Sequence, residues 1–269
     1  MAYVSSFIFN KQTNIAANKS TSIRIPSKKG HVNATFSKSY PQLPVISFEV
    51  INLKYFIFFI LGACIISFLK VIALDYPQIS ITRRSHCDSC DRILRWFEII
   101  PIIGYFIVHG RCFSCKNQID FWNPIQELLG GGLTAYLIFQ QDTVYLPLFF
   151  MLVLLSFSDF AFGYIYPIFY LLSLPTIFGL YHNLHPFISL IIYLSLLLLS
   201  KKYLLGLGDI EVIAILSLIF DLNITLKVIL MACFMCIISY LIKKKRSFRF
   251  IPYLAIATGI VYLIFSFKA

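Results

Sequence analysis

The sequence predicts an all-α polytopic membrane protein with about eight transmembrane helices. The first observation is composition: 59% of the 269 residues are hydrophobic and only 13% are charged, whereas soluble domains contain about 45–50% apolar and about 25% charged residues. The second is a series of apolar runs suited to a hydrocarbon layer about 30 Å thick. The third is that Lys and Arg gather in alternate connections. We therefore attribute the net charge of +11 to topology signals and not to nucleic-acid binding.

Residues 1–50 differ from the rest of the chain, because they are rich in Ser, Asn, Lys and Thr and their apolar residues are scattered. They contain no apolar segment followed by a cleavage site, so they make a poor secretory signal. We expect either a disordered extension or a mis-annotated start. The first transmembrane helix is expected within residues 51–80, over the apolar run 55–74.

Seven further apolar runs are expected to span, at 125–139, 144–158, 165–180, 186–200, 207–220, 224–242 and 251–265. Among the connections between the runs, those at 81–124, after residue 200 and after residue 242 carry the Lys and Arg, whereas the alternate turns carry none. Lys227 is the exception, just inside the seventh run. The positive-inside rule places the basic connections in the cytoplasm. Eight spans then place the C-terminus outside.

The cytoplasmic connection 81–124 contains two cysteine pairs in the spacing C-x2-C-x21-C-x2-C. The four residues are Cys87, Cys90, Cys112 and Cys115. Two such pairs predict a tetrahedral zinc site, and a reducing compartment disfavours disulfides. An iron–sulfur cluster is the alternative. Four thiolates leave no open coordination position, so the zinc is expected to be structural.

Other residues near this zinc-binding loop have simpler interpretations. His86 and His109 flank the cysteine pairs as spare ligands or as ordinary surface residues. The apolar run 99–108 is too short to span, so it either packs against the cysteines or lies at the membrane interface. Cys233 and Cys236 also form a C-x2-C pair, but they lie in the middle of an expected helix. We interpret them as packing residues.

Two aspartates are the candidate catalytic residues. Asp159 closes the third apolar run and Asp209 opens the sixth, directly after Gly206 and Gly208. Span parity puts both carboxyl groups at the cytoplasmic face, where two carboxyl groups can share a proton and act as acid and base. The glycines would let the backbone and a substrate strand approach Asp209 closely.

Each carboxylate also has a simpler interpretation. Asp209 could be a helix cap, and Asp159 could merely mark the end of a span. Glu211, two residues after Asp209, could be the functional group instead. Glu127, near the start of the second run, could be no more than a first-turn helix residue.

These residues together resemble the type IV prepilin peptidases, which belong to the GxGD aspartyl protease class. The resemblance is carried by GLGD at 206–209, Asp159 and the paired cysteines, and by the stretches ISFLKV, RSHCDSC, EIIPIIGYFIVHGRC, NPIQELLGG and IPYLAIATG. It covers residues 53–266 in order. The chain departs from the family pattern after Asp159, where Pro167 comes one residue late and Ile168 replaces a polar residue, and at Glu211, where Lys is common. These departures affect the expected substrate contacts.

The resemblance implies that residues 125–269 form an intramembrane aspartyl peptidase domain. It would cut the basic leader from type IV prepilin-like proteins, whose apolar N-terminal helix stays in the membrane lipid. Many members also methylate the new N-terminus with S-adenosylmethionine, but this sequence has no glycine-rich fingerprint that identifies a cofactor-binding residue. The layout resembles the Gram-positive, competence type in a cell membrane.

Two other function classes remain open at this point. One is a non-catalytic, zinc-stabilised membrane assembly factor of a pilus or DNA-uptake machine. The other is a small-solute or proton transporter, in which Asp159 and Asp209 would relay protons. A zinc knuckle fits a peptide-handling face better than a transporter, and no inverted repeat of broken spans is evident.

Overall fold

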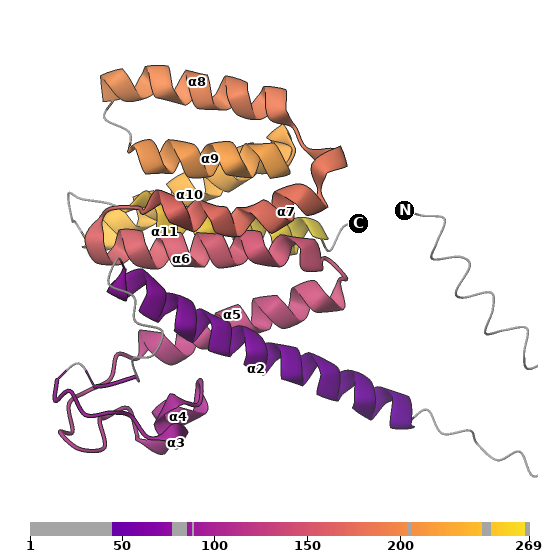
Figure 1. Ribbon diagram of the computed structural model, residues 1–269. Coiled ribbons are helices and arrows are strands. Elements are labelled where there is room, and N and C mark those ends of the chain that lie inside the picture. The colour runs from indigo at the N-terminus through magenta and orange to yellow at the C-terminus, as the bar shows by residue number, and fades with distance from the viewer. Residues whose placement is uncertain (1–44, 77–84, 88, 204–205, 244–248, 267–269) are drawn as a thin grey trace, which may run out of the picture. The chain divides into compact units, whose positions relative to one another are not determined.

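The computed structural model describes residues 45–76, 85–87, 89–203, 206–243 and 249–266. The chain divides into two units, Met1–Leu43 and Pro44–Ala269, and every described residue belongs to the second. The described part is mostly helical and contains two isolated β-bridges but no strand (Figure 1). The predicted helical class is therefore confirmed. Residues 1–44 lie outside the described residues, as do Arg83, Arg84 and the basic stretch 244–248.

The first described helix, α2 (Val45–Asp75), packs along α5 (Trp122–Phe139). It begins ten residues before the predicted run at 55–74, so residues 45–50 are helical and the disordered interpretation does not hold for them. The crossing of α2 and α5 is close because glycines line it. A Cβ atom placed on Gly131 would lie 2.6 Å from the Phe59 carbonyl oxygen, and one on Gly130 would lie 2.2 Å from Ile66 Cγ1. Small residues at such crossings let helix backbones approach.

Helix α6 (Leu146–Phe162) lies between α2 and α11 (Phe250–Ser266) and contributes the centre of the core (Figure 1). Its fully buried side chains include Leu148, Met151, Leu152 and Leu155. The 3-10 turn η1 (Thr143–Tyr145) leads into it. It ends at Gly163, whose φ of +65° suits a residue without a side chain.

The fourth apolar run forms two short helices instead of one. The 3-10 helix η2 (Pro167–Ser173) is followed by α7 (Leu174–Gly179) and the turn η3 (Tyr181–Asn183). Each of the two longer segments has a proline in its first two positions. Proline lacks an N–H and cannot continue a preceding helix, so Pro175 favours a helix start inside the run.

The remaining helices match the last four apolar runs. They are α8 (Pro186–Tyr203), α9 (Leu207–Ile219), α10 (Leu222–Lys243) and α11. Helices α8 and α9 lie side by side, as do α10 and α11 (Figure 1). The hydroxyl of Ser189 in α8 donates a 2.7 Å hydrogen bond to the Ala214 carbonyl in α9.

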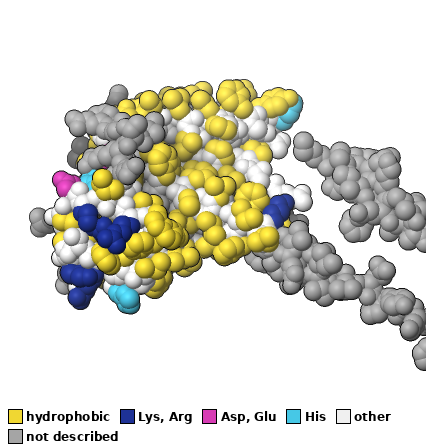
Figure 2. Space-filling view, turned by 60° about the horizontal axis from the view of Figure 1, so that its bottom comes forward, with side chains coloured by type: hydrophobic (Ala, Val, Ile, Leu, Met, Phe, Trp, Pro, Cys, Tyr) yellow, Lys and Arg dark blue, Asp and Glu magenta, His cyan; other side chains and the backbone are white. Residues whose placement is uncertain are grey.

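Three helical stretches are long and apolar enough to cross a membrane by length and composition: Leu53–Asp75, Thr143–Phe162 and Leu222–Ile242. Pro167–Gly179, Pro186–Ser200 and Phe250–Phe265 are apolar but shorter. The described surface exposes large apolar side chains on most helices, as the yellow areas of Figure 2 show. These features describe a multi-pass membrane protein. The count of eight spans goes beyond them.

Candidate metal centre and candidate active site

The four cysteines of the connection between α2 and α5 lie on two turns with the same backbone pattern. In the first, Cys87 N–H donates to the Arg92 carbonyl at 2.9 Å, and in the second Cys112 N–H donates to the Asn117 carbonyl at 2.8 Å. An isolated bridge closes each turn, His86 with Ile93 and Arg111 with Gln118. The sequence repeat C-x-S-C thus folds into two equivalent knuckles.

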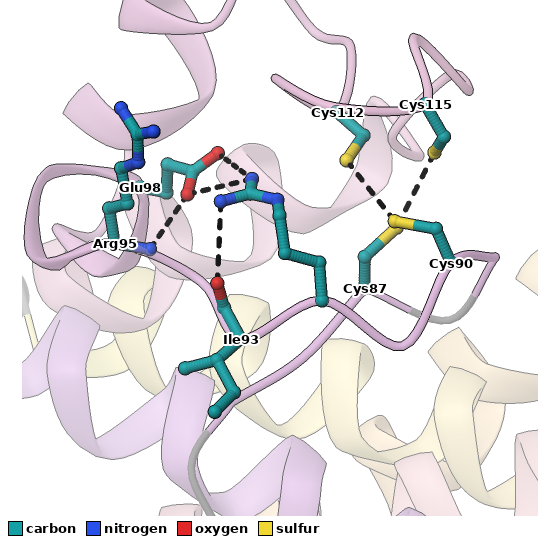
Figure 3. A network of polar contacts seen from close by, with 8 residues as sticks. Cys87, Cys90, Ile93, Arg95, Glu98, Cys112 and Cys115 are labelled. Carbon is teal, nitrogen blue, oxygen red and sulfur yellow. Dashed lines mark hydrogen bonds and ion pairs between the residues drawn. The ribbon is translucent and has the colours of Figure 1, made fainter.

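The two knuckles bring all four sulfur atoms within 4.8 Å of one another. Cys87 Sγ lies 3.8 Å from Cys115 Sγ, and Cys90 Sγ lies 4.0 Å from Cys112 Sγ (Figure 3). A tetrahedron with metal–sulfur bonds of about 2.3 Å separates its sulfurs by about 3.8 Å. The arrangement therefore fits a four-thiolate metal site, as the spacing predicted.

Backbone donors favour the thiolate form at one ligand. The N–H groups of Cys115 and then Ser114 lower the pKa of the Cys112 thiol to about 6. Cys112 is also the buried member of the set, whereas Cys90 and Cys115 are exposed. Because only the thiolate binds metal tightly, this environment prepares Cys112 as a ligand.

An ion pair supports the first knuckle and was not predicted from the sequence. The Arg92 guanidinium donates to both carboxylate oxygens of Glu98, at 2.7 and 3.0 Å, and lies beside the Cys112 sulfur (Figure 3). The Arg95 N–H donates to the same carboxylate at 2.7 Å. Burial raises the pKa of Glu98, but these hydrogen bonds outweigh it and hold that pKa below its usual range. Glu98 thus ties the knuckle to the short helix α3 (Trp96–Ile99).

The metal-site segment is also tied to α5. The Ile102 N–H donates a 2.7 Å hydrogen bond to Glu127 Oε2. Ile102 has a φ of +62°, which is strained for a β-branched residue. Glu127 is thus more than a first-turn residue, because it anchors this strained turn. Nearby, Lys70 donates to the side-chain oxygens of Asn123 and Gln126. The stretch ISFLKV of α2 therefore contacts the stretch NPIQELLGG of α5.

Asp159 lies in the last turn of α6 and is 9% exposed. Its Oδ2 atom has no hydrogen-bond partner among the described residues. Its carbonyl oxygen accepts the Gly163 N–H at 2.8 Å, and Ser158 Oγ donates to the Tyr164 carbonyl at 2.9 Å. These two bonds fix the turn that follows Asp159.

Asp209 lies in the first turn of α9 and close enough to Asp159 for the two carboxyl groups to interact electrostatically. The two glycines before it have different surroundings. Gly206 is exposed, and a Cβ atom on it would lie 3.0 Å from Asp209 Oδ2, whereas one on Gly208 would lie 2.3 Å from Ile165 Cδ1. Ile165 belongs to the turn after Asp159. The missing side chain of Gly208 therefore lets the start of α9 approach the end of α6.

Two further charged residues surround this pair of aspartates. Glu211 is half-buried beside Tyr170 of η2, and residues two apart on a helix point in different directions. Arg249, at the start of α11, interacts electrostatically with Asp159, and its guanidinium lies 5.7 Å from the centre of the Phe160 ring. Arg249 belongs to the basic connection after residue 242, and nothing in the local sequence connects it to α6.

Among the described residues, the remaining predicted candidates are not members of the four-cysteine cluster. Cys233 and Cys236 are in the middle of α10 and do not join the four-cysteine cluster. His86 lies 3.6 Å from the exposed carboxylate of Asp91. His109, with a φ of +53°, occupies an exposed turn.

Part of this chain is similar to known proteins. A family model described as the bacterial peptidase A24 N-terminal domain matches residues 60–141. That segment contains most of α2, the metal-site connection and α5. No solved structure gives a significant match.

Several curated relatives are named prepilin leader peptidase/N-methyltransferase. One from Myxococcus xanthus (strain DK1622) is 38% identical over 28% of this chain and 23% of its own length. One from Bacillus subtilis (strain 168) is 37% identical over 29% of this chain and 33% of its own length. One from Neisseria gonorrhoeae is 28% identical over 66% of this chain and 70% of its own length. The more identical matches thus span a third or less of those relatives. Together with the family model, these matches show that parts of the chain are similar to prepilin leader peptidase/N-methyltransferases.

Proposed function

We propose that this protein is a membrane aspartyl endopeptidase that removes the leader peptide from type IV prepilin-like proteins at the cytoplasmic membrane face. The observation that carries the proposal is the approach of Asp159 to Asp209, both half or more buried within a multi-pass helical protein. Two carboxyl groups that share a proton can activate water and protonate the leaving amine in peptide hydrolysis. The relatives are named prepilin leader peptidases, which supports the same activity.

We propose specific roles for the chain's own residues in this reaction. One of Asp159 and Asp209 takes a proton from water while the other donates one to the scissile peptide. Gly206 leaves room for a substrate strand beside Asp209, and Gly208 lets the backbone of α9 approach the turn after Asp159. The substrate's basic leader would arrive from the cytoplasm, and its apolar helix would remain among membrane lipids. Residues 125–269 would form this peptidase domain, with 51–80 as the first spanning segment and 81–124 as the metal-binding loop.

The first experiment replaces each aspartate separately by asparagine. Asp159→Asn and Asp209→Asn should each abolish leader cleavage without lowering expression, because each removes the same shared-proton chemistry. Cleavage is measured as a gel shift of a co-expressed prepilin-like substrate. Glu211→Gln is the matched control and should retain substantial activity.

The helix-cap interpretation gives the opposite result, because asparagine also caps helices well. Full processing by the Asp209→Asn variant would refute the catalytic role of Asp209, whereas substrate left unprocessed by the unaltered chain would favour the non-catalytic assembly factor. Loss of cleavage with Glu211→Gln, together with activity in Asp209→Asn, would transfer the catalytic role to Glu211.

We also propose that the four cysteines bind one structural zinc ion. A set of four thiolates suits zinc and leaves no position for substrate. Elemental analysis of purified protein should give about one zinc per chain. Cys112→Ser should lose the metal and lower the yield, whereas Cys233→Ser, in α10, should keep both. Iron in place of zinc would support the cluster alternative.

The relatives' names also contain N-methyltransferase, and we propose that this chain methylates the new N-terminus, with S-adenosylmethionine as methyl donor. The described residues contain no strand, and so no glycine-rich strand-to-helix turn of the kind that binds nucleotide cofactors. We therefore assign no residue to this cofactor. Mass spectrometry of the processed substrate tests for the added methyl group.

A further inference from the structure

We propose that the α3–α4 segment of the metal-binding loop is a membrane anchor, which inserts its apolar face into the headgroup boundary of the membrane that the helices cross. Helix α4 comprises Ile103–Ile107. We define the α3–α4 patch as Trp96, Ile99, Ile103, Phe106 and Ile107, all of which are exposed. The proposal rests on the multi-pass character of the protein and is independent of its peptidase activity.

The patch consists of the exposed apolar faces of two short helices. Trp96 and Ile99 are three residues apart, and Ile103, Phe106 and Ile107 follow the i, i+3, i+4 pattern, so each set lies on one helix face. Gly104 faces inward instead, since a Cβ atom there would lie 2.6 Å from the Glu98 carbonyl oxygen. Trp96 is 78% exposed and Phe106 is 63% exposed. Water alone is an unfavourable environment for so much adjacent apolar surface.

Contacts hold this segment beside the first turns of α5, close to the membrane-crossing part of α2. Ile102, between α3 and α4, is hydrogen-bonded to Glu127, which lies about 8 Å along α5 from its first residue. The first turns of α5 run beside Lys70 of α2, inside the membrane-crossing stretch Leu53–Asp75. The Tyr105 ring also lies 6.2 Å from the Phe121 ring, directly before α5.

Two chemical signals indicate lipid as the occupant of the patch. The chain has two tryptophans, and both Trp96 and Trp122 are mostly exposed in this region. Tryptophan favours the membrane interface because its ring is apolar and its N–H is polar. The exposed cations Arg95 and Lys116 lie 4.6 and 5.3 Å from the centre of the Phe113 ring. They are suited to anionic lipid phosphates above a buried apolar face.

Figure 2 shows how hydrophobic and basic side chains are distributed on one face of the molecule. Hydrophobic side chains extend from the metal-site end of the molecule over the neighbouring helices, and Lys and Arg side chains gather at that end. Hydrophobic side chains and basic side chains thus adjoin one another at this end of the molecule.

The test uses the two native tryptophans as separate reporters in the full-length, zinc-containing protein. Trp122→Phe leaves Trp96 as the emitting residue, and Trp96→Phe leaves Trp122 as an interfacial reference on α5. Each variant is reconstituted into vesicles of phosphatidylcholine and phosphatidylglycerol whose acyl chains are brominated near the headgroup. We expect these lipids to remove most of the Trp96 emission, to the same degree as the Trp122 emission.

A charge placed on the patch provides the second arm. Phe106→Asp should restore much of the Trp96 emission, because a carboxylate resists burial at the boundary. Gln118→Asp adds the same charge outside the patch, and the quenching should persist. Retained zinc shows that both variants keep the metal-binding loop folded.

Other outcomes would overturn the proposal. Trp96 emission that is insensitive to brominated lipid but fully accessible to aqueous iodide would show a water-exposed patch. Emission shielded from both quenchers, and dependent on the protein-to-lipid ratio, would show that a second copy of the chain covers it. Because the readout needs no substrate, an inactive protein would leave this result intact.

Discussion

At the scale of single residues, Glu98 joins the first cysteine knuckle to helix α3 in the metal-binding loop. Its side chain is 4% exposed and accepts two hydrogen bonds from Arg92, whose side chain is 24% exposed. Removing the Glu98 carboxylate would leave the Arg92 guanidinium and the Arg95 N–H without this acceptor, and an unpaired donor destabilises the fold.

Glu98→Ala should therefore speed zinc loss to a chelator at neutral pH and lower the thermal stability of the loop. Because the pKa of folded Glu98 is lowered, its stabilisation is fully present above about pH 4.3 and is lost as the pH falls through the lower folded value. Asp91→Asn is the matched control, since Asp91 is 88% exposed and asparagine tolerates its positive φ. Equal zinc loss from both variants would contradict the role of the pair.

At the scale of elements, the crossing of α2 and α5 contains its own control. A Cβ atom on Gly131 would lie 2.6 Å from the backbone oxygen of Phe59, whereas one on Gly132 would meet no atom within 4 Å. Both glycines are in the middle of α5, so alanine should improve helix propensity at each position to the same extent. Only the packing differs between them.

Gly131→Ala should therefore lower the unfolding temperature in detergent, because a backbone oxygen cannot move aside as a side chain can. Gly132→Ala should be neutral or slightly stabilising. A scan of thermal unfolding for the two variants side by side measures the difference. Equal unfolding temperatures would show that α2 and α5 do not cross as closely as described.

At the scale of the whole molecule, we propose eight spans with the metal-binding loop and both aspartates in the cytoplasm. The exposed turn after α5, at Gln141, would then lie outside. Single cysteines can be introduced into a protein whose Cys64, Cys233 and Cys236 are serines. Gln141→Cys should react with an impermeant maleimide in intact cells, and Lys116→Cys only after lysis. The reverse pattern would invert the topology.

The positions of the helices were predictable from the sequence because polar or glycine- and proline-containing turns separate the apolar runs. The convergence of the four cysteines was predictable for a similar reason, since two tight turns of the same pattern need no distant information. The early start of α2 at Val45 was missed because residues 45–50 alternate in polarity. The break in the fourth run follows from Pro175, which a search for long apolar runs does not detect.

The environment of the aspartates was less predictable, because it depends on contacts between distant segments. Arg249 approaches Asp159 from the start of the last described helix, and no periodic pattern connects the two. Ile102 and Glu127 are paired through a strained turn, in which the positive φ falls on Ile102 and not on a glycine. The catalytic pairing of Asp159 with Asp209 stays a prediction until the asparagine variants are measured.

The two equivalent knuckles also affect the chain entropy of the membrane helices. A metal ion held by both would cross-link the connection between Asp75 and Trp122 and so shorten its flexible length. Each halving of a flexible loop lowers the cost of closure by only about 0.6 kcal/mol. The crossing of α2 and α5 is formed by direct packing of the two helices, which does not require the metal ion. Removing the metal should therefore unfold the loop while the two helices stay paired in the membrane.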